Sequence, residues 1–70
     1  MEHIVLITWD EEAYVWCAVC DSIPLALESG SLDVLIERVK MAAPEMLALN
    51  GILSGTDTLC IKAERRARIA

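Results

Sequence analysis

Two neighbouring runs of β-branched and aromatic residues restrict the fold of this chain more than any other feature. They are His3 to Trp9 (HIVLITW) and Tyr14 to Cys20 (YVWCAVC), and the polar segment Asp10–Ala13 lies between them. Two such runs joined by a short polar segment are typical of a β-hairpin. We therefore expect the first twenty residues to form two antiparallel strands.

The expected register gives this hairpin two different faces. If Asp10 lies opposite Ala13, one face is aromatic and the other is aliphatic, because alternate residues of a strand point to opposite sides. The aromatic face then pairs Trp9 with Tyr14, Ile7 with Trp16, Val5 with Ala18 and His3 with Cys20, and the aliphatic face pairs Thr8 with Val15, Leu6 with Cys17 and Ile4 with Val19.

A change in the spacing of apolar residues predicts an amphipathic helix that begins after Ser31. Ser31 is a favourable N-cap, Asp33 in the first turn suits the helix dipole, and Asn50–Gly51 predicts a left-handed C-cap. Pro44 removes a backbone hydrogen bond inside this helix, so we expect a kink or a restarted turn there. The apolar stripe, at spacings of three and four residues, consists of Leu32, Leu35, Ile36, Val39, Ala42, Ala43, Met46 and Leu47.

The remaining segments predict an α+β fold of the order β-β-β-α-β. Asp21–Pro24 reads as a turn, Leu25–Glu28 as a short edge strand, Ser54–Thr56 as a loop and Thr58 to about Arg66 as a fourth strand. A right-handed helical crossover then gives the strand order 3-2-1-4, with the helix on one face. Because the helical stripe is aliphatic, we expect it to cover the aliphatic face and to leave the aromatic face open.

Size and composition limit the classes of function. The 70 residues predict one domain over residues 1–70, without a separate DNA-binding domain. With 56% hydrophobic residues, the chain has more apolar surface than a small core can hide, which favours a homo-oligomer, most simply a dimer. Charges interrupt every apolar stretch, so we expect no membrane span, and three cysteines, an odd number, favour a reducing cytoplasm.

The charges are unevenly placed along the chain. Residues 1–37 contain eight acidic residues and no lysine or arginine, whereas residues 38–70 contain six basic and three acidic residues. An acidic body repels phosphate, so direct nucleic-acid binding is not expected. Such a surface suits a basic protein partner, although a solvated surface that keeps the protein soluble is the simpler interpretation.

No set of residues predicts an enzyme, a metal site or a cofactor. Cys17 and Cys20 have a metal-like spacing, but in a strand their side chains point to opposite faces, which favours two small buried side chains. The acidic residues Asp10–Glu12 lie at a hairpin tip, where nothing holds them in the convergent geometry that a two-metal nuclease needs. His3, expected at a frayed terminus, leaves no pair of nucleophile and base.

One basic cluster stands near the C-terminal end of the sequence. As a nucleic-acid contact it is small and has no neighbouring aromatic residue. We favour the alternative that its charges protect an exposed edge strand from pairing with other chains. The cluster consists of Lys62, Arg65, Arg66 and Arg68.

Four short segments occur in a distinctive order and spacing: WDEEAYVW (Trp9–Trp16), DSIP (Asp21–Pro24), LESGSLDVLIERV (Leu27–Val39) and APEMLALNG (Ala43–Gly51). Together they make the run from Ile7 to Gly51 resemble the N-terminal domain of HicB-like antitoxins. The best match is a short branch of that family catalogued as a domain of unknown function. One departure is Leu25, where the family usually has glycine after the proline. The other concerns the DNA-binding domain that such antitoxins commonly carry, which we do not expect here.

The resemblance implies a truncated ribonuclease-H-like sheet that has lost its catalytic acids. It also implies a module that neutralises a small basic HicA-like mRNA-cleaving toxin by stoichiometric binding. The alternatives are a stand-alone homo-oligomeric interaction domain of the same fold and, less favoured, a weak nucleic-acid binder. We expect the partner or dimer interface to include Trp9, Tyr14, Trp16, Asp21 and Pro24.

Overall fold

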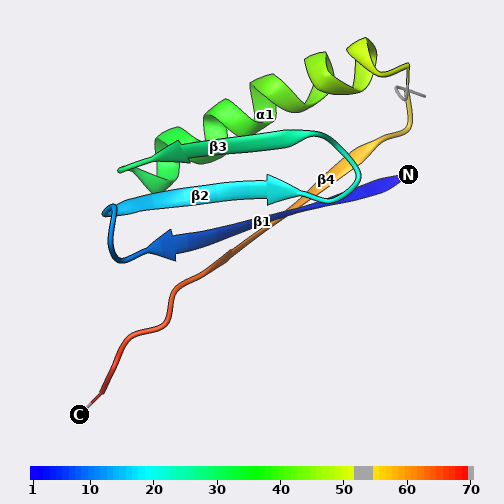
Figure 1. The fold of residues 1–70 in the computed structure, drawn as a ribbon. Coiled ribbons are helices and arrows are strands. Elements are labelled where there is room, and N and C mark those ends of the chain that lie inside the picture. Colours follow the sequence, from blue (N-terminus) through cyan, green and yellow to red (C-terminus); the bar gives the residue numbers. More distant parts are fainter. Residues whose placement is uncertain (52–54, 70) are drawn as a thin grey trace.

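The computed structural model describes residues 1–51 and 55–69, which form one mixed sheet and one helix (Figure 1). The strand order is β3-β2-β1-β4, with β1 antiparallel to β2, β2 antiparallel to β3, and β1 parallel to β4. The predicted α+β fold and strand order are confirmed, whereas Ser54 of the predicted loop lies outside the described residues. The elements are β1 (Glu2–Asp10), β2 (Val15–Cys20), β3 (Leu25–Ser29), α1 (Leu32–Leu49) and β4 (Thr58–Glu64).

The ends of α1 are capped as the sequence predicts. The Ser31 hydroxyl accepts a hydrogen bond from the backbone N–H of Val34 at 3.4 Å, and Gly51 adopts φ +65°, a conformation that glycine reaches without strain. The helix continues through Pro44 as a single element, so the restarted turn does not occur. In the described part of the chain, no helix combines the length and the apolar character needed to cross a membrane.

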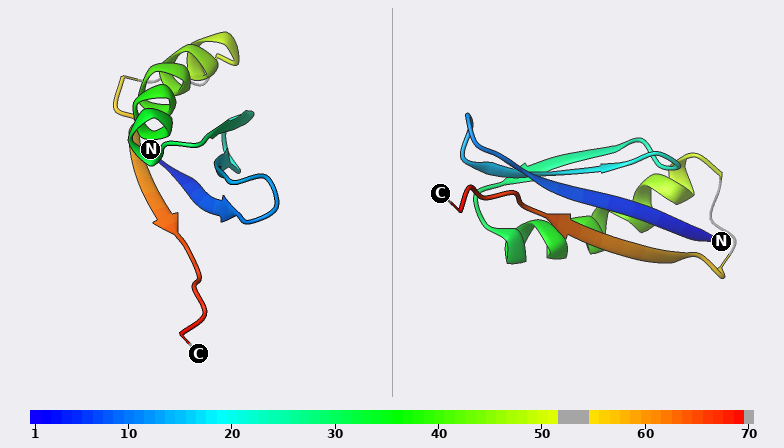
Figure 2. Two further views of the ribbon diagram at one scale, coloured as in Figure 1. Left: turned by 90° about the vertical axis from the view of Figure 1, so that its left-hand side faces the viewer. Right: turned by 90° about the horizontal axis from the view of Figure 1, so that it is seen from below.

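The core lies between α1 and one face of the sheet, and the views in Figure 2 show the helix on that side. The helix packs mainly against β3 and β2, and every residue of its predicted stripe is buried or packs against the core. Hydrophobic burial on this one face stabilises the fold. The buried apolar residues are Val5, Ile7, Ala18, Ile23, Leu25, Leu35, Val39, Ala43 and Leu47.

The register of the hairpin differs from the prediction by two residues. Trp9 lies opposite Trp16, and Ile7 lies opposite Ala18. The reason is a longer loop, because the carboxylate of Asp10 accepts the backbone N–H groups of Glu12 and Ala13 at 3.0 and 3.2 Å. Tyr14 completes the loop with φ +54°, in the left-handed region. A shift of two residues leaves each side chain on its predicted face.

The prediction that the helix covers the aliphatic face is wrong. The helix covers the face that carries His3, Val5 and Ile7, whereas Ile4 and Val19 on the other face are half exposed. The physical reason is the register, which places both tryptophans at one end of the sheet. The centre of their face is left to aliphatic side chains such as Ile7 and Ala18, which are completely buried in the core that the helix covers.

Candidate functional site

The face of the sheet opposite α1 carries an apolar patch that stays accessible to solvent. Ile4 and Val19 are 50% and 49% exposed, and the neighbouring Leu6 is half-buried and pairs directly with Val19. Exposed apolar patches of this kind mark surfaces that bind other proteins. We call this surface the open face, and define it by Ile4, Leu6, Cys17, Val19 and Cys60.

Acidic residues border the open face. Glu2 and Asp21 line a hollow of about 380 Å³ together with apolar side chains of the open face. Glu28 of β3 is in register with Cys17, and Glu64 of β4 is in register with Thr8. Lys62 of β4, in register with Leu6, also lies on this border. It is basic, whereas the four border residues named above are acidic. The surface therefore combines an apolar centre with a mostly negative border.

The three aromatic residues form one cluster, on the helix side of the sheet at the end where α1 begins. The rings of Trp9 and Trp16 meet edge to face, with centroids 5.3 Å apart, and Tyr14 lies 6.3 Å from Trp9 in a similar arrangement. Trp16 also packs against the core, and the indole N–H of Trp9 donates to the carboxylate of Glu11. We call Trp9, Tyr14 and Trp16 the aromatic cluster.

The residues that the sequence predicts for a single interface lie at two ends of the molecule. Asp21 and Pro24 are exposed in the turn between β2 and β3, while Trp16 lies at the start of β2. Asp21 lies five positions after Trp16 along the extended chain, which corresponds to about 17 Å at the usual rise of a strand. Asp21 borders the open face, whereas the aromatic cluster lies on the opposite side of the sheet.

The four residues of the basic cluster near the C-terminal end divide into two groups. Lys62 lies within β4, which is an edge strand of the sheet, and this supports its predicted role in protecting that edge. Arg65, Arg66 and Arg68 follow the strand, which ends at Glu64, two residues before the predicted end. All of these residues are exposed, and the guanidinium of Arg65 lies over the aromatic cluster.

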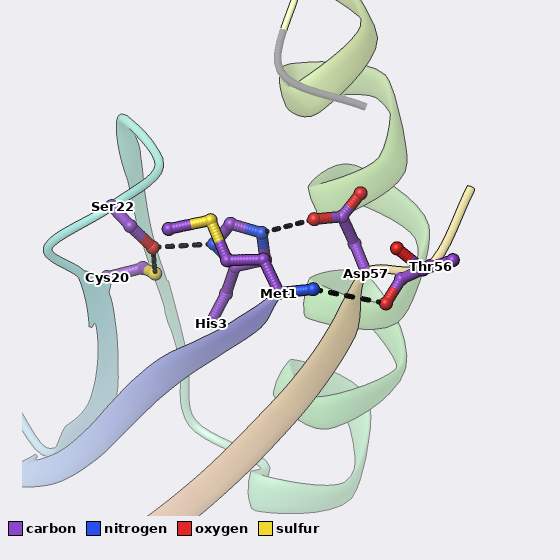
Figure 3. A network of polar contacts seen from close by, with 6 residues as sticks. All are labelled: Met1, His3, Cys20, Ser22, Thr56 and Asp57. Carbon is purple, nitrogen blue, oxygen red and sulfur yellow. Dashed lines mark hydrogen bonds and ion pairs between the residues drawn. The ribbon is translucent and has the colours of Figure 1, made fainter. Parts of the chain in front are cut away.

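A buried polar network was not foreseen from the sequence (Figure 3). His3 is 1% exposed, so it does not lie at a frayed terminus. Its Nδ1 atom lies 2.7 Å from the hydroxyl oxygen of Ser22, and its Nε2 atom lies 2.9 Å from a carboxylate oxygen of Asp57. A buried polar side chain needs hydrogen-bond partners. A histidine at an inward-facing position of an apolar strand therefore predicts that such partners lie nearby. This network joins β1 to the β2–β3 turn and to the segment before β4.

Cys17 and Cys20 lie on opposite faces of the sheet, as strand alternation predicts, but both are half-buried and not buried as expected. Cys17 lies on the open face and Cys20 packs against the core on the other side, so the two sulfurs point apart. Burial, followed by the nearby carboxylates of Asp10 and Glu28, raises the pKa of the Cys17 thiol. Among residues 1–51 and 55–69, no three His, Cys, Asp or Glu side chains are grouped closely enough to hold a metal ion.

A further hollow of about 470 Å³ lies on the helix side, between the second half of α1 and β4. Apolar side chains including Leu47, Leu59 and Ile61 line it, and His3 and Asp57 also contribute to its wall. The helix therefore covers β3 and β2 more completely than it covers β4.

These features define a small α+β domain in which one face of the sheet is covered and the other is open. The chain belongs to the family described as "Domain of unknown function (DUF1902)", whose model matches residues 2–70. It is also similar to the crystal structure of a hypothetical protein from the extremely thermophilic bacterium Thermus thermophilus. The TM-score is 0.82 at 34% sequence identity, over 99% of this chain and 100% of that one. No curated protein matches the chain.

Proposed function

We propose that this domain is a HicB-like antitoxin-type module, which binds and neutralises a small basic HicA-like mRNA-cleaving toxin. The observation that carries the proposal is the open face with its acidic border. An apolar centre supplies binding free energy when it is removed from water, and the border favours a partner of opposite charge. The sequence resemblance to HicB-like antitoxins supplies the kind of partner.

Long-range electrostatics supports the same proposal. The chain has a formal net charge of −5, and the acidic residues Glu2, Asp21 and Glu28 stand around the apolar centre. A negative surface of this kind speeds the diffusional approach of a basic protein and disfavours acidic competitors. Stoichiometric binding needs no catalytic group on the antitoxin, because occupying the toxin's surface is sufficient.

A homo-oligomeric interaction domain is the second candidate, and the same surface favours it. Two open faces could pack together and remove Ile4 and Val19 of both copies from water. The acidic borders would then face each other and repel, which makes a basic partner the better occupant. Nucleic-acid binding is less favoured, because a formal net charge of −5 repels phosphate.

The experiment that tests the proposal is co-expression with a small basic HicA-like protein of the same genome, sought first in the reading frames next to the gene for this chain. We expect that protein alone to arrest growth and cleave mRNA, and co-expression of this chain to relieve both effects. The two proteins should then co-elute as one complex of fixed stoichiometry.

Two results would decide against neutralisation. If growth arrest persists although both proteins are present in soluble form, this chain does not act as the antitoxin. If light scattering finds this chain only as multiples of itself in the presence of the basic protein, the homo-oligomeric domain becomes the better explanation.

A further inference from the structure

The aromatic cluster already holds a cation. The guanidinium carbon of Arg65 lies 4.3 Å from the centroid of the Trp9 ring and 6.0 Å from that of Trp16. A cation within about 6 Å of an aromatic ring face is attracted by the ring's electrons, and most strongly by tryptophan. The cluster is thus built to accept a planar positive group.

The surroundings of the aromatic cluster favour the same kind of group. A hollow of about 400 Å³ lies beside it, and Tyr14 is 72% exposed. The adjoining hairpin carries Asp10, Glu11 and Glu12, so the local charge is negative apart from the arginines of the C-terminal segment. The hollow is lined by Thr8, Trp9, Glu11, Glu64, Arg65 and Arg66.

This hollow lies at the ends of β1 and β4, and residues from both faces of the sheet line it. Thr8 and Glu64 are paired and point to the side of the open face. Trp9, the next residue of β1, belongs to the helix side, and Arg65, the first residue after β4, lies over its ring. A partner that lies on the open face would therefore reach the hollow at the end of β1. Thr8 and Glu64, in the wall of the hollow, lie on the same side of the sheet as the open face.

Arg65 is an occupant that a partner can replace. It follows the last residue of β4, and residues 65–69 are exposed and form no helix or strand. A cation–π contact at an exposed site is weak, so a partner's side chain that binds at the same place with additional contacts would displace it. Figure 1 shows this segment leading away from the body of the domain.

We infer that the aromatic cluster is a receptor for an arginine side chain of the basic partner, and that Arg65 occupies it until the partner binds. This inference rests on the proposed function and adds a recognition site to it. Arginine fits better than lysine because its guanidinium is planar and stacks on aromatic rings. Arg65 then acts as an internal competitor, which lowers the affinity for any side chain that must take its place on the rings.

The test uses N-acetyl-arginine amide as the probe and the two tryptophan indole N–H signals in NMR spectra as the readout. Trp9 and Trp16 are the two tryptophans of the chain, so both signals report on this site. We expect Arg65→Ala to bind the probe about two- to fivefold more tightly than the unchanged protein, the factor expected for loss of an exposed cation–π contact. The matched control is Arg68→Ala, which removes the same charge from the same exposed segment but outside the hollow, and should leave the affinity unchanged.

Two further measurements sharpen the interpretation. The neutral analogue N-acetyl-citrulline amide should shift neither signal, and Trp9→Leu should abolish the response of the remaining indole. Equal affinities for Arg65→Ala and Arg68→Ala, or an equal response to the neutral probe, would overturn the inference. If the probe binds as expected but the basic protein does not, the proposed function fails while the arginine site stands. If the basic protein binds equally well to both variants, the inference fails while the proposed function stands.

Discussion

The Nε2 atom of His3 lies 2.9 Å from a carboxylate oxygen of Asp57, although 54 positions separate the two residues in the chain. Both side chains are almost completely buried, with exposures of 0% and 6%. Because a carboxylate can only accept, the ring N–H of His3 donates in this contact. The pair fixes the start of β1 to the segment that leads into β4.

Removing this carboxylate should destabilise the domain. Asp57→Ala leaves a buried imidazole nitrogen without its partner, and we expect the free energy of unfolding to fall by about 1–3 kcal/mol. Urea denaturation followed by circular dichroism measures the change. Asp21→Ala, at an exposed turn position, serves as the control and should shift stability by less than about 0.5 kcal/mol. Equal losses for the two variants would show that the buried pair contributes nothing specific.

The packing of α1 predicts opposite results for two leucines of the same helix. Leu35 is fully buried, whereas Leu49 is 82% exposed. Leu35→Ala should lower the free energy of unfolding by about 2–5 kcal/mol, because it removes buried methyl groups and leaves a cavity. That loss is a large part of the stability of so small a domain, so this variant is expected to be partly unfolded at 37 °C. Leu49→Ala should melt within a few degrees of the unchanged protein, and a large drop in its melting temperature would contradict this packing.

The Cys17 thiol should react slowly at neutral pH. Burial and the carboxylates of Asp10 and Glu28 raise its pKa in the folded protein, so less thiolate, the reactive form, is present at any given pH. In a variant with Cys20→Ser and Cys60→Ser, alkylation by iodoacetamide should reach half its maximal rate at a higher pH than for the urea-unfolded chain. Adding Glu28→Gln should lower that midpoint. An identical midpoint in the folded and unfolded chains would refute the shift.

The same shift sets the sign of a pH effect on stability. A thiol whose pKa is higher in the folded state holds its proton more tightly there. Its stabilising contribution is therefore complete below the unfolded-state pKa and is lost as the pH rises through the folded-state value. We expect the Cys17→Ser variant to lose less stability than the unchanged protein between neutral and strongly alkaline pH.

Pro44 should be a site where stability can be gained. It lies inside an unbroken helix, where its missing N–H cannot bond to the carbonyl of Lys40, and its side chain is exposed. Pro44→Ala should raise the free energy of unfolding by up to about 3 kcal/mol, the usual cost of an interior proline. Thermal unfolding measures the gain. A lower melting temperature would mean that the proline has a packing role that its exposure does not suggest.

Local signals in the sequence predict the elements of this fold well. The hydroxyl of Ser31, the positive φ of Gly51 and the three- and four-residue spacing of the helical stripe act within a few residues of one another. The strand order could also be predicted, because the handedness of a crossover depends on chain chirality rather than on particular side chains.

Relationships across the sheet could not be predicted in the same way. The carboxylate of Asp10 bonds to two backbone N–H groups and lengthens the loop, and this moves Trp16 from opposite Ile7 to opposite Trp9. That shift groups both tryptophans at one end of the sheet and leaves the centre of the same face to Ile7 and Ala18, which belong to the core under the helix. The partners of His3, 19 and 54 positions away, follow from the folded arrangement and have no local sequence signal.

The most direct test of the open face compares two valines of nearly equal exposure. Val19, on the open face, is 49% exposed, and Val34, on the outer side of α1, is 51% exposed. A lysine at either position changes net charge, size and polarity equally, but only Val19→Lys places a positive charge at the centre of the proposed binding surface. The measurement is the affinity of each variant for the proposed HicA-like partner by isothermal titration calorimetry. We predict a loss of at least about tenfold for Val19→Lys, as expected for a charge buried at an interface, and no change for Val34→Lys. Equal affinities for the two variants would contradict binding through the open face.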